Sequence, residues 1–157
     1  MKRYLAYAFI VVAVSLAGCA GQPVSPLPKP SPGAQAEVMV YRESSFIAGG
    51  VSLTVGAGTK AFASISNSEY VSANLSAGEQ DIFVQARTAN PTRLHLKLQP
   101  GSRVCLRTSS SPSTLAKVAI PIALIATGYH FYLDEIPCLS VEELAKYKQV
   151  FVSYEAN

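Results

Sequence analysis

Apolar and polar residues alternate along most of the chain from residue 37 onward, with the period of two that is typical of β-strands. The clearest example is 93–99, where Leu94, Leu96 and Leu98 alternate with charged or polar residues. Such alternation indicates one buried and one solvated face. Similar short runs, separated by turn residues, predict further strands at 37–42, 51–55, 60–66, 70–75, 81–87, 103–108 and 129–133. We therefore expect a mostly β fold, a single small antiparallel β-sandwich.

Two later segments depart from this alternation. At 140–147, Ser140 and Glu143 have the spacing of a capping box, which predicts a short C-terminal helix. The apolar run at 118–127 is interrupted by Pro121 and is too short to cross a bilayer, which takes about 20 residues. A core strand is the expectation for this run, and a loop that touches lipid or an apolar ligand is the alternative. The last residues, 150–154, form either an edge strand or a tail.

The chain begins with a targeting pattern. Lys2 and Arg3 precede an uncharged apolar run at 5–15, which is the arrangement of a secretory signal peptide. Leu16-Ala17-Gly18-Cys19 follows and resembles the lipobox of bacterial lipoproteins. The resemblance implies cleavage between Gly18 and Cys19, with lipid, palmitate included, attached to Cys19. Several acyl chains hold a protein on a membrane almost permanently. An ordinary signal peptide with a chance cysteine is the less favoured interpretation.

These patterns divide the chain into three parts: a signal peptide at 1–18, a lipidated Cys19 with a tether at 19–36, and a β-sandwich domain at 37–157. The tether contains five of the ten prolines, which favours an extended spacer without a core of its own. Ala20, rather than the Asp that retains many such lipoproteins at the inner membrane, follows Cys19. By that family rule we expect the outer membrane, with the domain facing the periplasm.

The charge of the chain excludes one class of function. Lys2 and Arg3 account for two of the 13 basic residues, so the mature chain carries 11 against 10 acidic residues, a formal net charge of +1. Nucleic-acid binding needs a basic patch or stripe, and a nearly neutral protein offers no electrostatic case for it. We expect no nucleic-acid partner.

Two cysteines remain once Cys19 is assigned to lipid. Cys105 and Cys138 form an even pair in an exported protein, where disulfides persist. Buried free thiols and a metal pair are the alternatives, but the two residues lack the spacing of a zinc site. A structural disulfide is the favoured assignment. It predicts that strands 103–108 and 130–136 are neighbours.

Part of the domain also resembles a known family. The first strand ends in Val40-Tyr41-Arg42, Ser44-Ser45-Phe46 and a strand at 51–55 follow, and Leu75-Ser76-Ala77-Gly78-Glu79 forms a later turn. This pattern is similar to bacterial envelope lipoproteins of unknown function with a small PEGA-like β-sandwich. The resemblance spans roughly 37–133 and implies a fold and a compartment, without any catalytic residue. Gly56-Ala57-Gly58 replaces the family's usual Asp-Gly turn.

Candidate catalytic chemistry is sparse. The two histidines, His95 and His130, fall on a solvated strand face and among aromatic residues, and no nucleophile elbow, zinc-protease motif or phosphate-binding Gly loop is present. We therefore expect no enzyme activity, no catalytic residue, no metal and no cofactor. One surface hypothesis is a basic patch for anionic lipid or an acidic polymer; the favoured alternative is a solvated sheet face neutralised by carboxylates. The candidate patch comprises Arg93, His95, Lys97, Arg103 and Arg107.

The expected function is that of a lipid-anchored envelope lipoprotein, a structural or binding accessory module. Its expected partners are the membrane, through the anchor, and an envelope protein or polymer. Two alternatives belong to other classes: an assembly factor of a secretion or surface machine, and a hydrolase that acts on an envelope polymer. Convergence of histidines and carboxylates in a cleft would favour the hydrolase, whereas scattered positions would favour the binding module.

Overall fold

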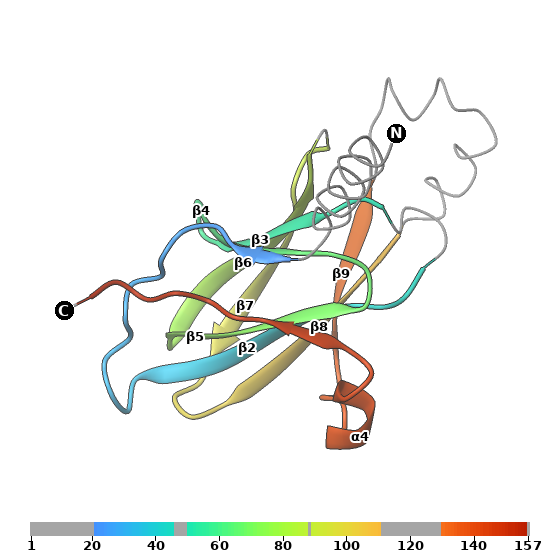
Figure 1. The fold of residues 1–157 in the computed structure, drawn as a ribbon. Helices are drawn as coiled ribbons and strands as arrows, with labels where there is room; N and C mark the ends of the chain where they lie inside the picture. Colours follow the sequence, from blue (N-terminus) through green and yellow to red (C-terminus); the bar gives the residue numbers. More distant parts are fainter. Residues whose placement is uncertain (1–20, 46–49, 88, 111–129, 157) are drawn as a thin grey trace, which may run out of the picture.

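The computed structural model describes residues 21–45, 50–87, 89–110 and 130–156, which form two five-stranded sheets and one short helix (Figure 1). Sheet I contains, in spatial order, β1 (Gln22–Pro23), β4 (Lys60–Ile65), β3 (Leu53–Ala57), β6 (Gly78–Ala86) and β7 (Thr92–Leu98). Sheet II contains β10 (Lys148–Val150), β5 (Glu69–Ser76), β2 (Gln35–Arg42), β8 (Arg103–Ser110) and β9 (Phe131–Ile136). The mostly β class is therefore confirmed.

The expectation of a single antiparallel sandwich is corrected in one respect. Sheet I is antiparallel throughout, but sheet II is mixed, because β2 pairs with β8 in parallel and β10 pairs with β5 in parallel. The chain between β2 and β8 forms β5 and four of the five strands of sheet I, so β2 and β8 are not joined by a hairpin turn. Hairpins fix antiparallel pairing, whereas distant segments are free to pair in either direction.

The two sheets share one hydrophobic core. Alternate residues of facing strands point into it, among them Val38 and Val40 of β2 and Ile82 and Val84 of β6, each at most 1% exposed. Full burial of such side chains contributes about 1.5–3 kcal/mol each. The same pattern holds in β7, where Leu96 and Leu98 are buried as the alternation predicts.

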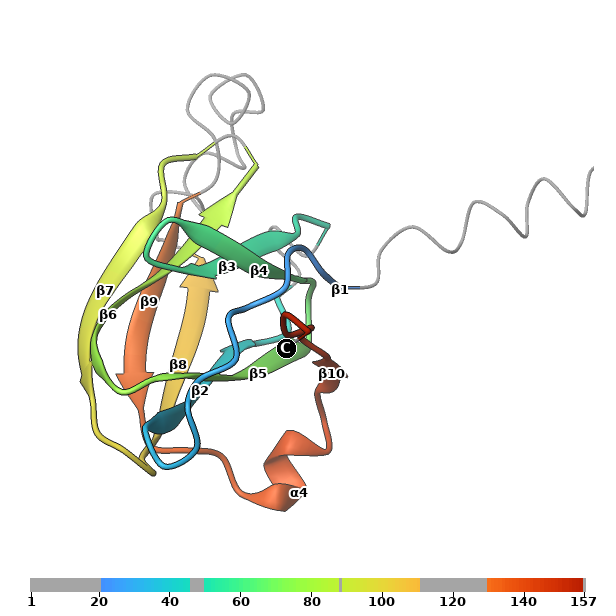
Figure 2. The same ribbon diagram turned by 90° about the vertical axis from the view of Figure 1, so that its left-hand side faces the viewer.

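The segment expected to be a tether is packed against the domain. β1 pairs with β4, and Leu27 is 3% exposed as part of the core. Leu27 also forms a parallel bridge with Tyr154, so this N-terminal segment runs beside the C-terminal one (Figure 2). Prolines are tolerated here because an edge strand does not need every N–H for its ladder. From Gly21 onward, the structure thus differs from the expected extended spacer.

The predicted helix is present but shorter than expected. α4 (Val141–Leu144) is one turn long, and its N-terminus has the predicted capping box. The Ser140 amide donates to Glu143 Oε2 at 2.9 Å, and the Glu143 amide donates to Ser140 Oγ at 3.3 Å. The strand expected at 129–133 is found two residues later, as β9, whereas the run at 118–127 lies outside the described residues.

The segment around α4 covers the outer face of sheet II. Met39, Tyr41 and Cys105 point away from the main core but are buried, since a second apolar cluster encloses them. The partly buried members of that cluster are Tyr70, Ile136, Leu139, Leu144 and Tyr147. In the part of the chain that the structure describes, no helix has the length and apolar character needed to cross a membrane.

Candidate functional site

The predicted cleavage site at Gly18 and the predicted lipid anchor, Cys19, lie outside the described residues. Gly21, two positions after Cys19, is held by hydrogen bonds. The Gly21 amide donates to the Glu69 carboxylate, at 2.9 Å from Oε2 and 3.1 Å from Oε1. Glu69 is 4% exposed and also accepts the Ser66 amide at 2.7 Å, with Lys148 Nζ 3.7 Å away. A buried carboxylate that accepts several N–H groups is well satisfied, so it holds the N-terminal segment in place.

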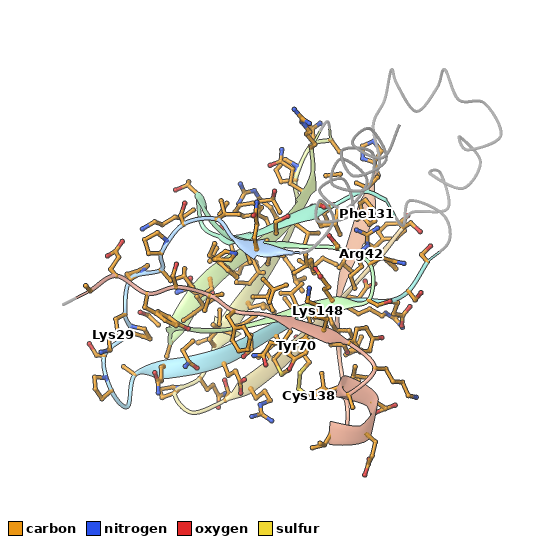
Figure 3. All side chains as sticks on the ribbon, viewed as in Figure 1. Lys29, Arg42, Tyr70, Phe131, Cys138 and Lys148 are labelled. Carbon is orange, nitrogen blue, oxygen red and sulfur yellow. A yellow bond between two sulfur atoms is a disulfide. The ribbon has the colours of Figure 1, made fainter. Side chains whose placement is uncertain are left out.

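The predicted disulfide is confirmed. Cys105 and Cys138 are bonded, and their Cα atoms are 5.1 Å apart, inside the range of about 4.4–6.8 Å that a bridge allows. Strands β8 and β9 are neighbours, with Cys105 opposite Ile136, as the bridge requires. Cys105 lies on the outer phase of β8, as predicted, yet it is only 2% exposed because the α4 segment covers it. Figure 3 shows Cys138 beside α4, which the bridge ties to sheet II.

The five residues of the candidate basic patch are divided between the two sheets. Arg93, His95 and Lys97 lie on β7, an edge of sheet I, whereas Arg103 and Arg107 lie on β8 inside sheet II. The turn between β7 and β8 carries the chain from one sheet to the other, so strands adjacent in sequence do not pair. The candidate patch therefore draws on strands of two sheets instead of one sheet face.

Carboxylates accompany the two arginines of the candidate patch on sheet II. Arg103 Nε lies 2.6 Å from Glu37 Oε2, and Arg107 Nη1 lies 3.5 Å from Glu43 Oε1. Arg93 instead stacks over the Phe83 ring, with 5.0 Å from its guanidinium carbon to the ring centroid. Acidic side chains thus lie beside both arginines of sheet II, whereas Arg93 of sheet I lies against an aromatic ring.

His95 sits between two carboxylates that the sequence analysis did not connect with it. Its Nδ1 lies 2.7 Å from Asp81 Oδ1 and its Nε2 lies 2.6 Å from Glu79 Oε2. The hydrogen bonds to Asp81 and then Glu79 raise the pKa of His95 above its usual value. Hydrogen bonds from both ring nitrogens to carboxylates favour the protonated imidazolium form of His95. An imidazolium has no free nitrogen to accept a proton, so it is a poor general base. Among the described side chains, no group of three His, Cys, Asp or Glu could hold a metal ion.

Arg42 is a charged residue inside the domain. It is 2% exposed, donates to the Val51 carbonyl and lies over the Phe131 ring, 5.2 Å from its centroid (Figure 3). Burial lowers the pKa of Arg42, and the Glu69 carboxylate opposes that effect. Its contacts connect β2 with β9 and with Val51, which lies just before β3. Arg42 therefore has a structural role.

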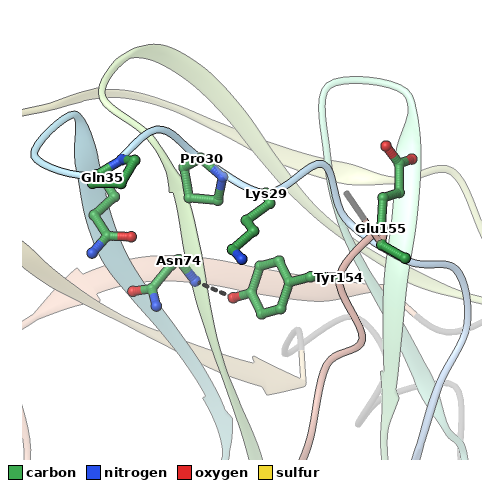
Figure 4. Close-up of a pocket in the computed structure, with 8 residues that line it drawn as sticks. Lys29, Pro30, Gln35, Asn74, Tyr154 and Glu155 are labelled. Carbon is green, nitrogen blue, oxygen red and sulfur yellow. Dashed lines mark hydrogen bonds between the residues drawn. The ribbon is translucent and has the colours of Figure 1, made fainter.

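A groove where the terminal segments meet is a candidate binding site. It has a cavity volume of about 460 Å³ and is open to solvent. Figure 4 shows Lys29, Asn74 and Tyr154 in this groove, where the Tyr154 hydroxyl accepts a hydrogen bond from the backbone N–H of Asn74 at 2.7 Å. The lining residues are Lys29, Pro30, Pro32, Gln35, Asn74, Tyr154, Glu155 and Ala156. Amide, charged and aromatic groups together suit a polar ligand, because they supply donors, acceptors and a ring face.

This groove was missed by the sequence analysis, which assigned Lys29 to Gln35 to a spacer and left 150–154 as a strand or tail. The signal that could have found it is Leu27, an apolar residue within a proline-rich run. No family model matches this chain, and no curated protein or solved structure shows a significant match to it. The resemblance of 37–133 to envelope lipoproteins thus stays a hypothesis.

Proposed function

We propose that this protein is a lipid-anchored lipoprotein of the bacterial cell envelope, which serves as a non-catalytic structural or binding accessory module. The observation that carries the proposal is the Cys105–Cys138 disulfide. Disulfides persist outside the reducing cytoplasm, which supports export. The chain has three cysteines, so the bridge leaves Cys19 of the lipobox as the thiol available for lipid.

The test of the anchor is metabolic labelling with an alkyne analogue of palmitate in cells that express the full chain. The wild type should incorporate label, lose residues 1–18 and fractionate with membranes. Cys19→Ser should remain an unlabelled, uncleaved precursor. The matched control is the double variant Cys105→Ser/Cys138→Ser, which lacks the bridge and should still be labelled. Normal processing and membrane attachment of Cys19→Ser would refute the lipid anchor.

We further propose the outer membrane as the destination, on the ground that Ala20 follows the anchored cysteine. Density fractionation of the envelopes should place the wild type with outer-membrane markers. The variant Ala20→Asp carries the retention residue of the lipoprotein family rule and should shift to the inner-membrane fraction. Co-fractionation of both proteins with inner-membrane markers would contradict this assignment.

A binding role is supported by the open groove beside Tyr154, since an accessory module needs a surface that can accept a ligand. A photo-crosslinking residue at Lys29, inside the groove, should give a discrete adduct with an envelope component in intact cells. The matched control is the same probe at Lys146, which is exposed after α4 and outside the groove. Identical adducts at both positions would argue against specific binding in the groove.

A further inference from the structure

The two ends of the described chain lie together along one side of the domain. The Leu27 amide donates to the Ser153 carbonyl at 2.9 Å, and the Glu155 amide donates to the Leu27 carbonyl at 2.8 Å. At the other end of this contact, Gly21 lies close to Val150. A Cβ atom added to Gly21 would be only 2.6 Å from Val150 Cγ2. We name the surface formed by 21–27 and 150–154 the terminal seam.

The terminal seam exposes apolar side chains. Four large apolar residues are exposed within the described part of the chain, and two of them belong to the seam. These are Val24, 50% exposed, and Phe151, 71% exposed. Val24 follows β1 directly and Phe151 follows β10 directly, so each is placed by a hydrogen-bonded edge strand. Because the two segments run side by side, the seam presents both of these apolar side chains to solvent.

The chain length between the seam and the predicted lipid anchor is very short. Cys19 precedes Gly21 by two residues, and a fully extended chain spans at most about 3.6 Å per residue, or about 7 Å for two. Because Glu69 holds the Gly21 amide, residues after Gly21 do not lengthen this link. An acylated Cys19 would therefore bring the bilayer surface to the seam itself.

The geometry points to the terminal seam as a membrane-contact surface, covered by the bilayer that carries the acyl chains of Cys19. This inference rests on the proposed lipidation. Val24 and Phe151 would enter the interfacial region, where apolar side chains gain from leaving water. Lys148, whose side chain is 65% exposed near Glu69, offers a positive charge to anionic headgroups at the same end. The domain would thus lie on the membrane instead of standing away from it on a spacer.

The test uses the full acylated protein in vesicles of phosphatidylethanolamine and phosphatidylglycerol that contain a phospholipid with a spin label on its headgroup. A single fluorophore is attached through Val24→Cys, Phe151→Cys or Lys97→Cys. Lys97 is exposed on β7, the edge of sheet I opposite β1, and four strand spacings, or about 19 Å, separate these two edges. We expect strong loss of emission at 24 and 151 and none at 97.

A second set of variants tests the apolar contact without a label on it. With the fluorophore at Ser153→Cys, the double substitution Val24→Asp/Phe151→Asp should weaken quenching by the labelled headgroups, although the acyl anchor still holds the protein on the vesicle. Val141→Asp changes a more exposed apolar residue on α4, 83% exposed and outside the seam, and should leave the quenching unchanged. Equal effects of the two changes would overturn the inference.

Mass spectrometry and vesicle flotation of the same samples separate the two proposals. Protein that is acylated on Cys19 and floats, but shows no difference in quenching between 24 and 97, would overturn the membrane-contact surface and leave the anchor intact. Protein that lacks acylation and fails to float would overturn both.

Discussion

The carboxylate of Glu69 accepts the backbone N–H of Gly21, with Oε2 2.9 Å from the amide nitrogen. This contact joins the first described residue to the start of β5, across 48 positions in sequence. It positions β1 at the edge of sheet I, while Lys148 of β10 approaches the same carboxylate from sheet II. One side chain therefore connects the N-terminal segment with both sheets.

Replacement of Glu69 should destabilise the domain. Glu69→Ala leaves the Gly21 and Ser66 amides without their acceptor, and the loss of hydrogen bonds to a buried charged group costs roughly 1.5–3 kcal/mol. The free energy of unfolding from urea titration measures this loss. Glu155→Ala is the control, because its ion pair with Lys60 is exposed on both sides and should change stability little. Equal losses in the two variants would contradict the role of Glu69.

The disulfide should stabilise the domain without affecting its attachment to the membrane. Cys105 and Cys138 are 33 positions apart, and the chain-entropy model gives roughly 3–4 kcal/mol for a loop of this size. Reduction of the native protein should lower the midpoint of urea unfolding accordingly. The variant Cys105→Ala/Cys138→Ala should show the same lower midpoint and no further change on reduction. A reduced protein as stable as the oxidised one would show that the bridge is not structural.

Local patterns along the sequence predicted much of this structure. The alternation at 93–98 specified the inward face of β7, and Ser140 with Glu143 specified where α4 begins. The cysteine pairing followed from the number of cysteines and the expected export of the chain. In each case, a short stretch or a simple count contained the information.

Relationships between distant segments were not predictable in this way. The parallel pairing of β2 with β8 depends on where the chain returns, which alternation does not encode. The proline content of 21–36 indicated a spacer, whereas the burial of Leu27 depends on a partner, Tyr154, far along the chain. His95 meets Asp81 because of the register between β6 and β7, which no local pattern specified.

The hydroxyl of Tyr41 should be dispensable for stability. Tyr41 is 1% exposed, and within the described residues its hydroxyl is buried without a hydrogen-bond partner. Removal of an unsatisfied buried hydroxyl is close to neutral or stabilising, so Tyr41→Phe should unfold at an equal or higher urea concentration. Tyr154→Phe is the matched control. It removes the hydroxyl that accepts the backbone N–H of Asn74 and should lower the free energy of unfolding by about 0.5–1.5 kcal/mol. A clear loss of stability in Tyr41→Phe would contradict the assignment.

The same tyrosine predicts a loss of stability at alkaline pH. Burial, and next the neighbouring Tyr147, raise the pKa of Tyr41 to about 12. The unfolded chain releases this proton near its ordinary pKa of about 10, so unfolding is favoured as pH rises from there toward 12. A difference of about two units between the folded and unfolded pKa of Tyr41 corresponds to roughly 2–3 kcal/mol of unfolding free energy. Urea unfolding at pH values on both sides of 10 should show a loss in the wild type that is smaller in Tyr41→Phe.

His95 should titrate above the ordinary range of histidine, because hydrogen bonds to Asp81 and Glu79 favour its charged form. A histidine whose pKa is raised on folding contributes stability that is fully present below its unfolded pKa, near 6.5, and is lost as pH rises through the folded value. Titration followed by the NMR shifts of the imidazole ring measures the folded pKa directly. Asp81→Asn should lower that pKa, and Glu79→Gln should lower it less, since Asp81 has the larger effect. Ser52→Ala, a change directly before β3 that affects a contact with Ser66 instead, should leave the titration unchanged. A wild-type pKa at or below the ordinary value would show that the two carboxylates do not hold the imidazolium in solution.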